Sequence, residues 1–390
     1  MSVTAAAGFR AGSVDAGLAS RGGVDLTVII NEGPSDAAAC VFTSNKAKAH
    51  PILWSQQAIK DGHARAIVLN AGGANCFTGP EGFALTHKSA ETLAAGLVDV
   101  GAHDILVCST GLIGEPLPER AVIDGITAAM ALADSSPEAG ATAAEAILTT
   151  DSRAKTAVRT RETPAGTFTV GGMAKGAGML APGLATMLVV ITTDVLLEPE
   201  ELDGALRRAT NVSFDRLDSD GCMSTNDQVT LMASGASGLR PELADFEQVL
   251  TELCLDLSHQ LLSDAEGSSH DIAISVRQAV SEEDAVAVGR AVARSNLVKA
   301  AIFGQDPNWG RVLAAIGTVD VEFDVYGVDV TMNGVQVCRH GGPDRPRSEV
   351  DLSPRATSIE IDLHAGSASA TVWTNDLTHD YVHENSAYSS

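Results

Sequence analysis

The residues with the clearest chemical potential lie in one segment near the middle of the chain, Gly171 to Asp194. Glycine, proline and other small residues dominate its first half, where they allow tight backbone geometry and the close approach of a ligand. Met187 to Ile191 is apolar enough to be a strand inside a sheet. Thr186 therefore stands where a glycine-rich loop meets a buried strand, and its hydroxyl is a candidate nucleophile.

A threonine hydroxyl is a poor nucleophile at neutral pH unless a base lies beside it. The α-amine of a chain that begins with that threonine is one such base. Cleavage between Ala185 and Thr186 would release this amine. A strained loop that pressed the hydroxyl onto the Ala185 carbonyl would favour an N-to-O acyl shift, and strain of this kind costs about 1 to 3 kcal/mol. The ordinary alternative is a β-branched residue that begins a strand.

The same glycines allow a second interpretation. Gly176, Gly178 and Ala181 have the spacing of a dinucleotide-binding fingerprint. That motif requires a helix to begin at once, because the helix N-terminus holds the pyrophosphate. Pro182 and the apolar strand that follows argue against such a helix. A nucleotide-dependent oxidoreductase and a binding protein without catalysis stay as alternatives.

The elements that must position this segment are a mixture of helices and strands. Apolar residues at three- and four-residue spacing predict helices, and short apolar runs or period-two alternation predict strands. The predicted helices are Phe83 to Leu97, Arg120 to Ala133 and Pro241 to Ala265. The predicted strands are Ala66 to Asn70, Ile105 to Cys108, Ile272 to Val276, Val321 to Val325 and Ile359 to Leu363. This mixture indicates an α/β or α+β fold with antiparallel strands in the second half. Ser135 to Ala141 and Gly341 to Pro354 are the most loop-like stretches.

Length and charge limit the function classes. A chain of 390 residues with 45% hydrophobic content can bury a large core, as two or three domains or one two-lobed domain. Its 50 acidic and 26 basic residues give a formal net charge of -24, which would repel nucleic acids and anionic membranes. No apolar stretch reaches the roughly 20 residues that span a bilayer, and the N-terminus has no signal-like pattern. We therefore expect a cytoplasmic protein with no nucleic-acid or membrane partner.

The six cysteines are scattered along the chain, and none forms a Cys-x-x-Cys pair. We therefore expect neither a structural zinc site nor a disulfide framework. The threonine chemistry requires no metal and no bound cofactor.

Several motifs together resemble one known family along the whole chain. The segment Gly171-Gly-Met-Ala-Lys-Gly-Ala-Gly-Met-Leu-Ala-Pro182, with Leu184-Ala-Thr-Met-Leu188 after it, is similar to the cleavage segment of the ornithine acetyltransferases. These enzymes are also called glutamate N-acetyltransferases. Further matching motifs are Asn70 to Asn75, Cys108 to Gly114, Thr149 to Asp151, Ser224 to Asp227, Asp264 to Gly267, Asp306 to Arg311 and Asn385 to Ser390.

The resemblance implies a precursor that is cut between Ala185 and Thr186. The α chain would be residues 1–185 and the β chain residues 186–390, and two of each would form a heterotetramer. The implied fold is the family's two-lobed α/β fold, an α+β layered sandwich shared with self-processing aminopeptidases.

The resemblance also implies a reaction. Thr186 would take the acetyl group from N2-acetyl-L-ornithine and pass it to L-glutamate in arginine biosynthesis, with ping-pong kinetics. The sequence leaves open whether acetyl-CoA is a second acetyl donor. An aminopeptidase or amidase that cleaves itself in the same way, with water as the acceptor, is the alternative.

Roles outside the cleavage segment follow from the same resemblance. The Thr110 hydroxyl and the Gly111 backbone N–H would stabilise the oxyanion of the tetrahedral intermediate. Lys175 would hold the α-carboxylate that both substrates carry, since no acidic residue in its loop neutralises it. Ser224 to Asp227 and Asp306 to Arg311 would support the pocket walls, with no chemical step assigned to them.

Two further groups of residues match substrate-contacting positions of the family. The pattern places Glu266 at the end of the long helix, just before a capping Gly267, where its carboxylate opposes the helix dipole. The resemblance implies that Glu266 contacts an amino group of ornithine. Thr149, Asn385 and Ser390 also match such positions, so the C-terminus is expected to fold into the pocket.

Overall fold

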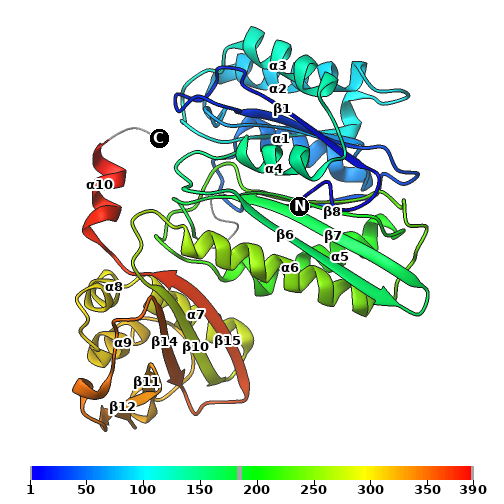
Figure 1. The fold of residues 1–390 in the computed structure, drawn as a ribbon. Coiled ribbons are helices and arrows are strands. Elements are labelled where there is room, and N and C mark those ends of the chain that lie inside the picture. The colour runs from blue at the N-terminus through cyan, green and yellow to red at the C-terminus, as the bar shows by residue number, and fades with distance from the viewer. Residues whose placement is uncertain (1, 182–186, 388–390) are drawn as a thin grey trace.

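The computed structural model describes residues 2–181 and 187–387, which form three sheets with helices packed against them (Figure 1). The first sheet has the strand order β1-β2-β4-β5. Its strands are β1 (Phe9–Val14), β2 (Leu26–Asn31), β4 (Ala66–Asn70) and β5 (Ile105–Ser109). The second sheet has the order β3-β9-β8-β7-β6. Its strands are β3 (Ala38–Phe42), β9 (Gln228–Ala233), β8 (Leu188–Thr193), β7 (Gly166–Lys175) and β6 (Lys155–Thr163).

These two sheets and their helices form successive layers (Figure 1). The helices α2 (Gly79–Ala95) and α3 (Glu119–Ala131) cover the outer face of the first sheet, and α4 (Pro137–Glu145) lies between the sheets. The helices α5 (Pro199–Val212) and α6 (Leu243–Ser263) cover the outer face of the second sheet. The helix α1 (His50–Ala58) packs on β5. Every residue of β8 and β9 is buried, because both faces of their sheet are covered.

The third sheet forms the C-terminal part of the molecule (Figure 1). It has the order β13-β12-β11-β14-β10-β15. Its strands are β10 (Asp271–Ala279), β11 (Asp329–Met332), β12 (Val335–Arg339), β13 (Gly342–Pro343), β14 (Ala356–Asp362) and β15 (Ala368–Asn375). Its apolar core includes residues of α7 (Glu282–Ala293), α8 (Asn296–Phe303) and α9 (Trp309–Ile316). The helix α10 (His379–Ala387) follows β15. No helix in the described part of the chain is long and apolar enough to cross a membrane.

Several predicted elements are confirmed. The long helix predicted over 241–265 is α6, since the apolar residues recur with helical spacing and their face is buried against the second sheet. The strand predicted at 66–70 is β4, and the one predicted at 105–108 is β5 with one more residue. The predicted mixture of helices and sheets is therefore the α/β layered fold that the structure has.

Other predictions are wrong. Residues 321–325 form no strand: Val321 and Phe323 pack against the C-terminal core, but no neighbouring strand pairs with this stretch. The predicted loop at 135–141 contains the start of α4, because Ser136 caps the helix and Pro137 occupies its first turn. The strands β10 and β14 pair in parallel, although their alternation predicted antiparallel pairing, which β10 makes with β15 instead.

The connection between β7 and β8 bears on two further expectations. The described residues 176–181 form no helix, and β8 begins at Leu188. The helix that a dinucleotide fingerprint needs is therefore not found in the described part of this connection. The expected division at position 185 falls between β7 and β8, which pair with each other inside one sheet.

Candidate active site

A buried cation lies at the end of β7. Lys175 is the last residue of this strand, and only 2% of its side chain is exposed. Its Nζ donates hydrogen bonds to the Thr149 hydroxyl oxygen at 2.8 Å and to the Thr110 hydroxyl oxygen at 3.3 Å. An ammonium group has three donors and no acceptor, so both hydroxyls must accept from it. Each threonine therefore keeps its own O–H free to donate to another group.

Asp151 neutralises this cation, a contact that the sequence expectation for Lys175 did not include. Its Oδ2 lies 3.5 Å from Lys175 Nζ, and its Oδ1 lies 2.6 Å from Lys155 Nζ and accepts a 2.6 Å bond from the Gly176 N–H. Lys155 Nζ also contacts Asp264 at 2.5 Å. Burial by itself would raise the pKa of Asp151. The charges of Lys175 and Lys155 and the hydrogen bonds outweigh it and lower that pKa to about 2.

A glycine turn follows β5 beside this cluster. Gly111 has φ +126°, and a Cβ atom there would lie 2.5 Å from the carbonyl carbon of Gly72. Only glycine fits this position without strain. No hydrogen bond of the Gly111 N–H to another described residue is found, so this donor is available to a ligand. Asn226 supports the turn by donating to the carbonyl oxygens of Ser109 and Ala74, at 2.9 and 2.6 Å.

A buried carboxyl group lies beside the start of β8. Asp227 Oδ1 accepts a 3.0 Å hydrogen bond from the Met187 N–H. Burial raises the pKa of Asp227 well above its usual range. Its Oδ2 has no hydrogen-bond partner among the described residues. Met187 follows Thr186 in the sequence, while Ala185, Thr186 and Ser390 lie outside the described residues.

Glu266 links the loop after β7 to the C-terminal helix. Its Oε1 accepts a 2.7 Å bond from the Thr150 hydroxyl, and its Oε2 accepts a 2.9 Å bond from Asn385 Nδ2 in α10. Its backbone N–H donates to the Ala177 carbonyl oxygen at 3.0 Å. A Cβ atom on Gly178 would lie 2.5 Å from Glu266 Oε2, so this glycine admits the carboxylate. Glu266 does not end the long helix as predicted, since α6 stops at position 263.

A cavity of about 460 Å³ opens beside Glu266 and is rich in carboxylates. Four of its lining residues are acidic, namely Asp264, Glu266, Asp380 and Glu384. Burial, and after it the negative charges of Glu266 and Asp380, raise the pKa of Glu384. A cation bound here would relieve this repulsion. The cavity wall therefore suits an amino group of a ligand.

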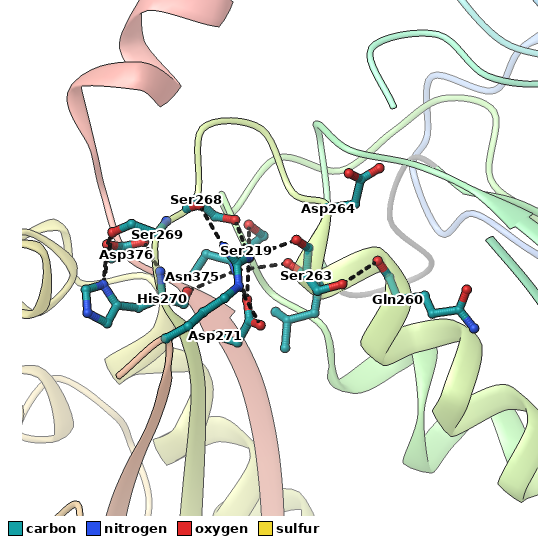
Figure 2. A network of polar contacts seen from close by, with 12 residues as sticks. Ser219, Gln260, Ser263, Asp264, Ser268, Ser269, His270, Asp271, Asn375 and Asp376 are labelled. Carbon is teal, nitrogen blue, oxygen red and sulfur yellow. Dashed lines mark hydrogen bonds and ion pairs between the residues drawn. The ribbon is translucent and has the colours of Figure 1, made fainter. Parts of the chain in front are cut away.

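A hydrogen-bond network joins this wall to the third sheet (Figure 2). Asn375 Nδ2 donates to the carbonyl oxygens of Leu262 and His270, at 3.1 Å each, and Asp376 Oδ1 accepts from the Ser269 and His270 N–H groups at 2.9 Å. Ser269, His270 and Asp376 are the residue types of a hydrolytic triad. However, the serine and the aspartate contact the same ring nitrogen, Nδ1, and Nε2 faces a backbone carbonyl. We therefore interpret this cluster as a structural link between the cavity wall and the third sheet.

The residues expected from the sequence gather in two neighbouring groups. One holds Thr110, Gly111, Thr149 and Lys175, and the other holds Glu266 and Asn385. Segments 149–151 and 176–178 contribute to both groups, so the groups are adjacent. Asp151 and Asp227 were missed as site residues. Their signal was present in the sequence, since both lie in motifs that carried the resemblance.

Paired hydroxyl and N–H donors near a buried lysine lie beside an acidic cavity, an arrangement that suits an enzyme of the acyltransferase class. The family comparison gives the particular family. The chain belongs to the ArgJ family, whose model matches residues 10–390.

Curated relatives match over the full length. The chain is 57% identical over 390 residues to the arginine biosynthesis bifunctional protein ArgJ of Thermobifida fusca, with all of both chains covered. It is 49% identical over 392 residues to the protein of the same name from Mycobacterium tuberculosis, covering 100% of this chain and 96% of that one.

Two of the matching solved structures cover about half of the chain. One is an ornithine acetyltransferase from Mycobacterium tuberculosis complexed with ornithine, at 47% identity and a TM-score of 0.44, covering 48% of this chain and 96% of that chain. Another is an arginine biosynthesis bifunctional protein from Bacillus halodurans, at 33% identity and a TM-score of 0.49, covering 51% of this chain and 98% of that chain.

Proposed function

We propose that this chain transfers the acetyl group of N2-acetyl-L-ornithine to L-glutamate through an acetyl ester on Thr186. The observation that carries the proposal is the polarity of the site. A buried lysine with two hydroxyl groups lies on one side of the loop after β7, and Glu266 with an acidic cavity lies on the other. N2-acetyl-L-ornithine carries one carboxylate and one free amine, and these charges suit the two sides.

The first half-reaction begins at the Thr186 hydroxyl, whose proton passes to the α-amine of the same residue. The oxygen attacks the acetyl carbonyl carbon, and the oxyanion accepts hydrogen bonds from the Thr110 hydroxyl and the Gly111 N–H. The Thr110 proton is free for this because its oxygen accepts from Lys175. Losing one such donor typically costs about 3 kcal/mol in the barrier. The amide C–N bond then breaks, and the proton leaves with the ornithine amine.

In the second half-reaction the amine of glutamate attacks the acetyl ester. The Thr186 oxygen leaves as the hydroxyl group, and acetylglutamate is released. Lys175 holds the α-carboxylate of the acceptor as it held that of the donor. The ester and free threonine alternate, so the kinetics are ping-pong.

The catalytic amine arises by self-cleavage between Ala185 and Thr186, which yields chains 1–185 and 186–390. Backbone strain in the preceding segment supports this step, since Met179 has a left-handed φ of +54°. The Thr186 oxygen attacks the Ala185 carbonyl carbon, the C–N bond breaks, and water hydrolyses the ester. The fixed Met187 N–H, held by Asp227, supports a defined geometry after the cut.

The proposal also covers the assembly of the two chains, their cellular location and the acetyl donors. Two chains of each kind form a heterotetramer in the cytoplasm, and no bound cofactor takes part. The name bifunctional that the relatives carry supports a second acetyl donor, and acetyl-CoA is the candidate.

The first test is intact mass spectrometry of the wild type, Thr186→Ala and Thr186→Ser. We expect two fragments that begin at Met1 and Thr186 in the wild type, and one uncut chain in Thr186→Ala. Thr186→Ser keeps a hydroxyl and should still be cut. A wild type that stays whole, or is cut elsewhere, removes the activated threonine from the proposal.

The second test separates a transferase from an aminopeptidase or amidase. Labelled ornithine is incubated with acetylornithine and processed enzyme, without glutamate. Exchange of label into acetylornithine without net hydrolysis indicates an acetyl-enzyme that water does not attack. Release of acetate at the rate of ornithine release would instead favour the amidase.

A further inference from the structure

A cluster of metal-ligating side chains lies at one edge of the third sheet, away from the residues used above. Asp329 begins β11, His340 follows the end of β12, and His364 follows the end of β14. Residues 329 and 362 are register partners in the antiparallel β11–β14 pair, and β12 runs antiparallel to β11 on its other side. The topology therefore brings three separate segments to the same sheet edge.

The donor atoms of this cluster have the spacing of a metal site. Asp329 Oδ2 lies 3.2 Å from His364 Nε2, and Asp329 Oδ1 lies 3.8 Å from His340 Nδ1. One ligand atom from each of the three residues can be chosen so that all lie within 4.8 Å of one another. A tetrahedral ion with bonds of about 2.1 Å separates its ligand atoms by about 3.4 Å. Small side-chain rotations would bring the three atoms to these distances.

The surroundings of His364 favour a ligand role. Its Nδ1 lies 3.3 Å from Asp362 Oδ1, which leaves Nε2 directed at Asp329. Metal-binding histidines almost always place the second ring nitrogen against a carboxylate, a carbonyl or a water in this way, which fixes the ring and the tautomer. Asp362 would therefore orient the ring for an ion bound at Nε2.

The backbone at both histidines is unusual. His340 has φ +47° and His364 has φ +51°, a left-handed conformation that L-residues seldom adopt. The His340 N–H donates a 2.8 Å bond to Asp329 Oδ1, which fixes the turn beside the carboxylate. These two strained turns direct two imidazoles toward one carboxylate.

The site has room for an ion and a water. A cavity of about 750 Å³ includes both histidines and the carboxylates of Glu322 and Asp324 in its lining. The Gly327 carbonyl oxygen lies 3.4 Å from His340 Nδ1. Two imidazoles with a carboxylate suit zinc and similar transition ions, whereas magnesium and calcium prefer oxygen ligands alone.

We propose that Asp329, His340 and His364 bind a divalent transition cation of the zinc type, with water as the fourth ligand. The site is independent of the acetyl-transfer residues. The cysteine pattern gave no sign of it, because its ligands come from three segments that meet only in the folded sheet. The bound ion ties together the ends of β11, β12 and β14.

The test is calorimetric titration of Zn²⁺ into the full untagged protein after removal of metals with a chelator. We expect one equivalent to bind to the wild type, and binding at least about tenfold weaker in His340→Ala, His364→Ala and Asp329→Asn. His63→Ala is the matched control, since His63 also contacts an aspartate at 2.8 Å and is exposed, but lies elsewhere. Mg²⁺ should produce no heat of binding.

A second measurement covers variants that fold poorly. Saturating Zn²⁺ should raise the Tm of the wild type and of His63→Ala, because an ion that binds only the folded state stabilises it. The Tm of His364→Ala should not change. Two results overturn the proposal: a wild type that binds no Zn²⁺ at about 1 mM, or a His364→Ala variant that binds it as tightly as the wild type.

Discussion

Ion pairs beside the candidate site, in the central part of the molecule, are buried, whereas ion pairs on the C-terminal sheet are exposed to water. At the ends of β6 and β7, the side chains of Lys155 and Asp151 have no exposed surface and lie 2.6 Å apart. On the third sheet, Arg277 and Glu360 lie 2.8 Å apart, yet 59% and 35% of these side chains remain exposed. The two distances are almost equal. The pairs differ in their exposure to water, and this exposure decides how much stability is lost when one partner is removed.

A buried charge that loses its partner has no water to replace it, whereas an exposed charge regains its hydration. The central network therefore has to be complete. Lys175 has Asp151 beside it, and the other oxygen of that aspartate holds Lys155. The exposed pairs of the third sheet can be removed one by one. The fixed cation of the candidate site, Lys175, lies in the buried network. Four predictions test the contrast between buried and exposed pairs.

The largest effect is expected from Asp151→Ala, because it leaves Lys175 buried without a carboxylate partner and leaves Lys155 with Asp264 alone. We expect a loss of about 3 to 5 kcal/mol in the free energy of unfolding. The loss is measured by urea unfolding in a Thr186→Ala background, so that a single chain unfolds. The same background without Asp151→Ala is the control. A loss below about 1 kcal/mol would mean that water enters the network and that it is not dry.

A smaller effect is expected from Gly178→Ala, which places a methyl group 2.5 Å from Glu266 Oε2. The carboxylate must move, and kcat/KM for acetylornithine should fall by about tenfold or more, the value of a charge-assisted hydrogen bond. Gly342→Ala is the matched control, since the nearest atom to its new Cβ lies 3.6 Å away. Equal activity of the two variants would contradict a role for Glu266 in binding.

The third prediction concerns pH. Burial and the charges of Glu266 and Asp380 raise the pKa of Glu384, so this group gains its proton at a higher pH than an ordinary glutamate. Affinity for an ammonium group should therefore fall as the pH falls through that raised pKa. Glu384→Gln should remove this dependence and change KM by about twofold to fivefold. Measuring KM against pH in both proteins checks it, and parallel profiles would be the contrary result.

The smallest effect is expected from Arg277→Ala on the third sheet. Its pair with Glu360 is exposed and screened by water, so the free energy of unfolding should change by less than about 1 kcal/mol. The urea experiment described for Asp151→Ala gives the comparison directly. A loss as large as that of Asp151→Ala would show that burial does not decide the strength of these pairs.

Local sequence patterns predicted individual helices and strands, but they did not predict how the strands pair. The helix α6 followed from apolar spacing within one segment, and β4 followed from one apolar run. Period two correctly placed β10 and β14 but could not reveal their parallel pairing, because the partner of a strand lies elsewhere in the sequence. At 321–325 the alternation was real, yet pairing never formed. Ser136, which caps α4, and Pro137, its first residue, suited both a loop and a helix start.

The candidate site shows the same limit. Thr110, Thr149 and Lys175 were named through a family resemblance, and the structure brings them together. The place of Asp151 between two lysines could not be read from the sequence, because the network closes through Asp264, more than a hundred positions away in the chain. Long-range contacts of this kind exist only after folding.

The strand order of the second sheet has a consequence for the kinetics of refolding. The β chain of the proposed cut supplies β9 and β8, and the α chain supplies β3 on one side and β7 with β6 on the other. Uncut Thr186→Ala molecules can rebuild this alternation in a first-order process. Once the bond is cut, two separate chains must meet, so refolding becomes second order and slows on dilution. The cleavage that creates the nucleophile would thus also make unfolding at low concentration hard to reverse.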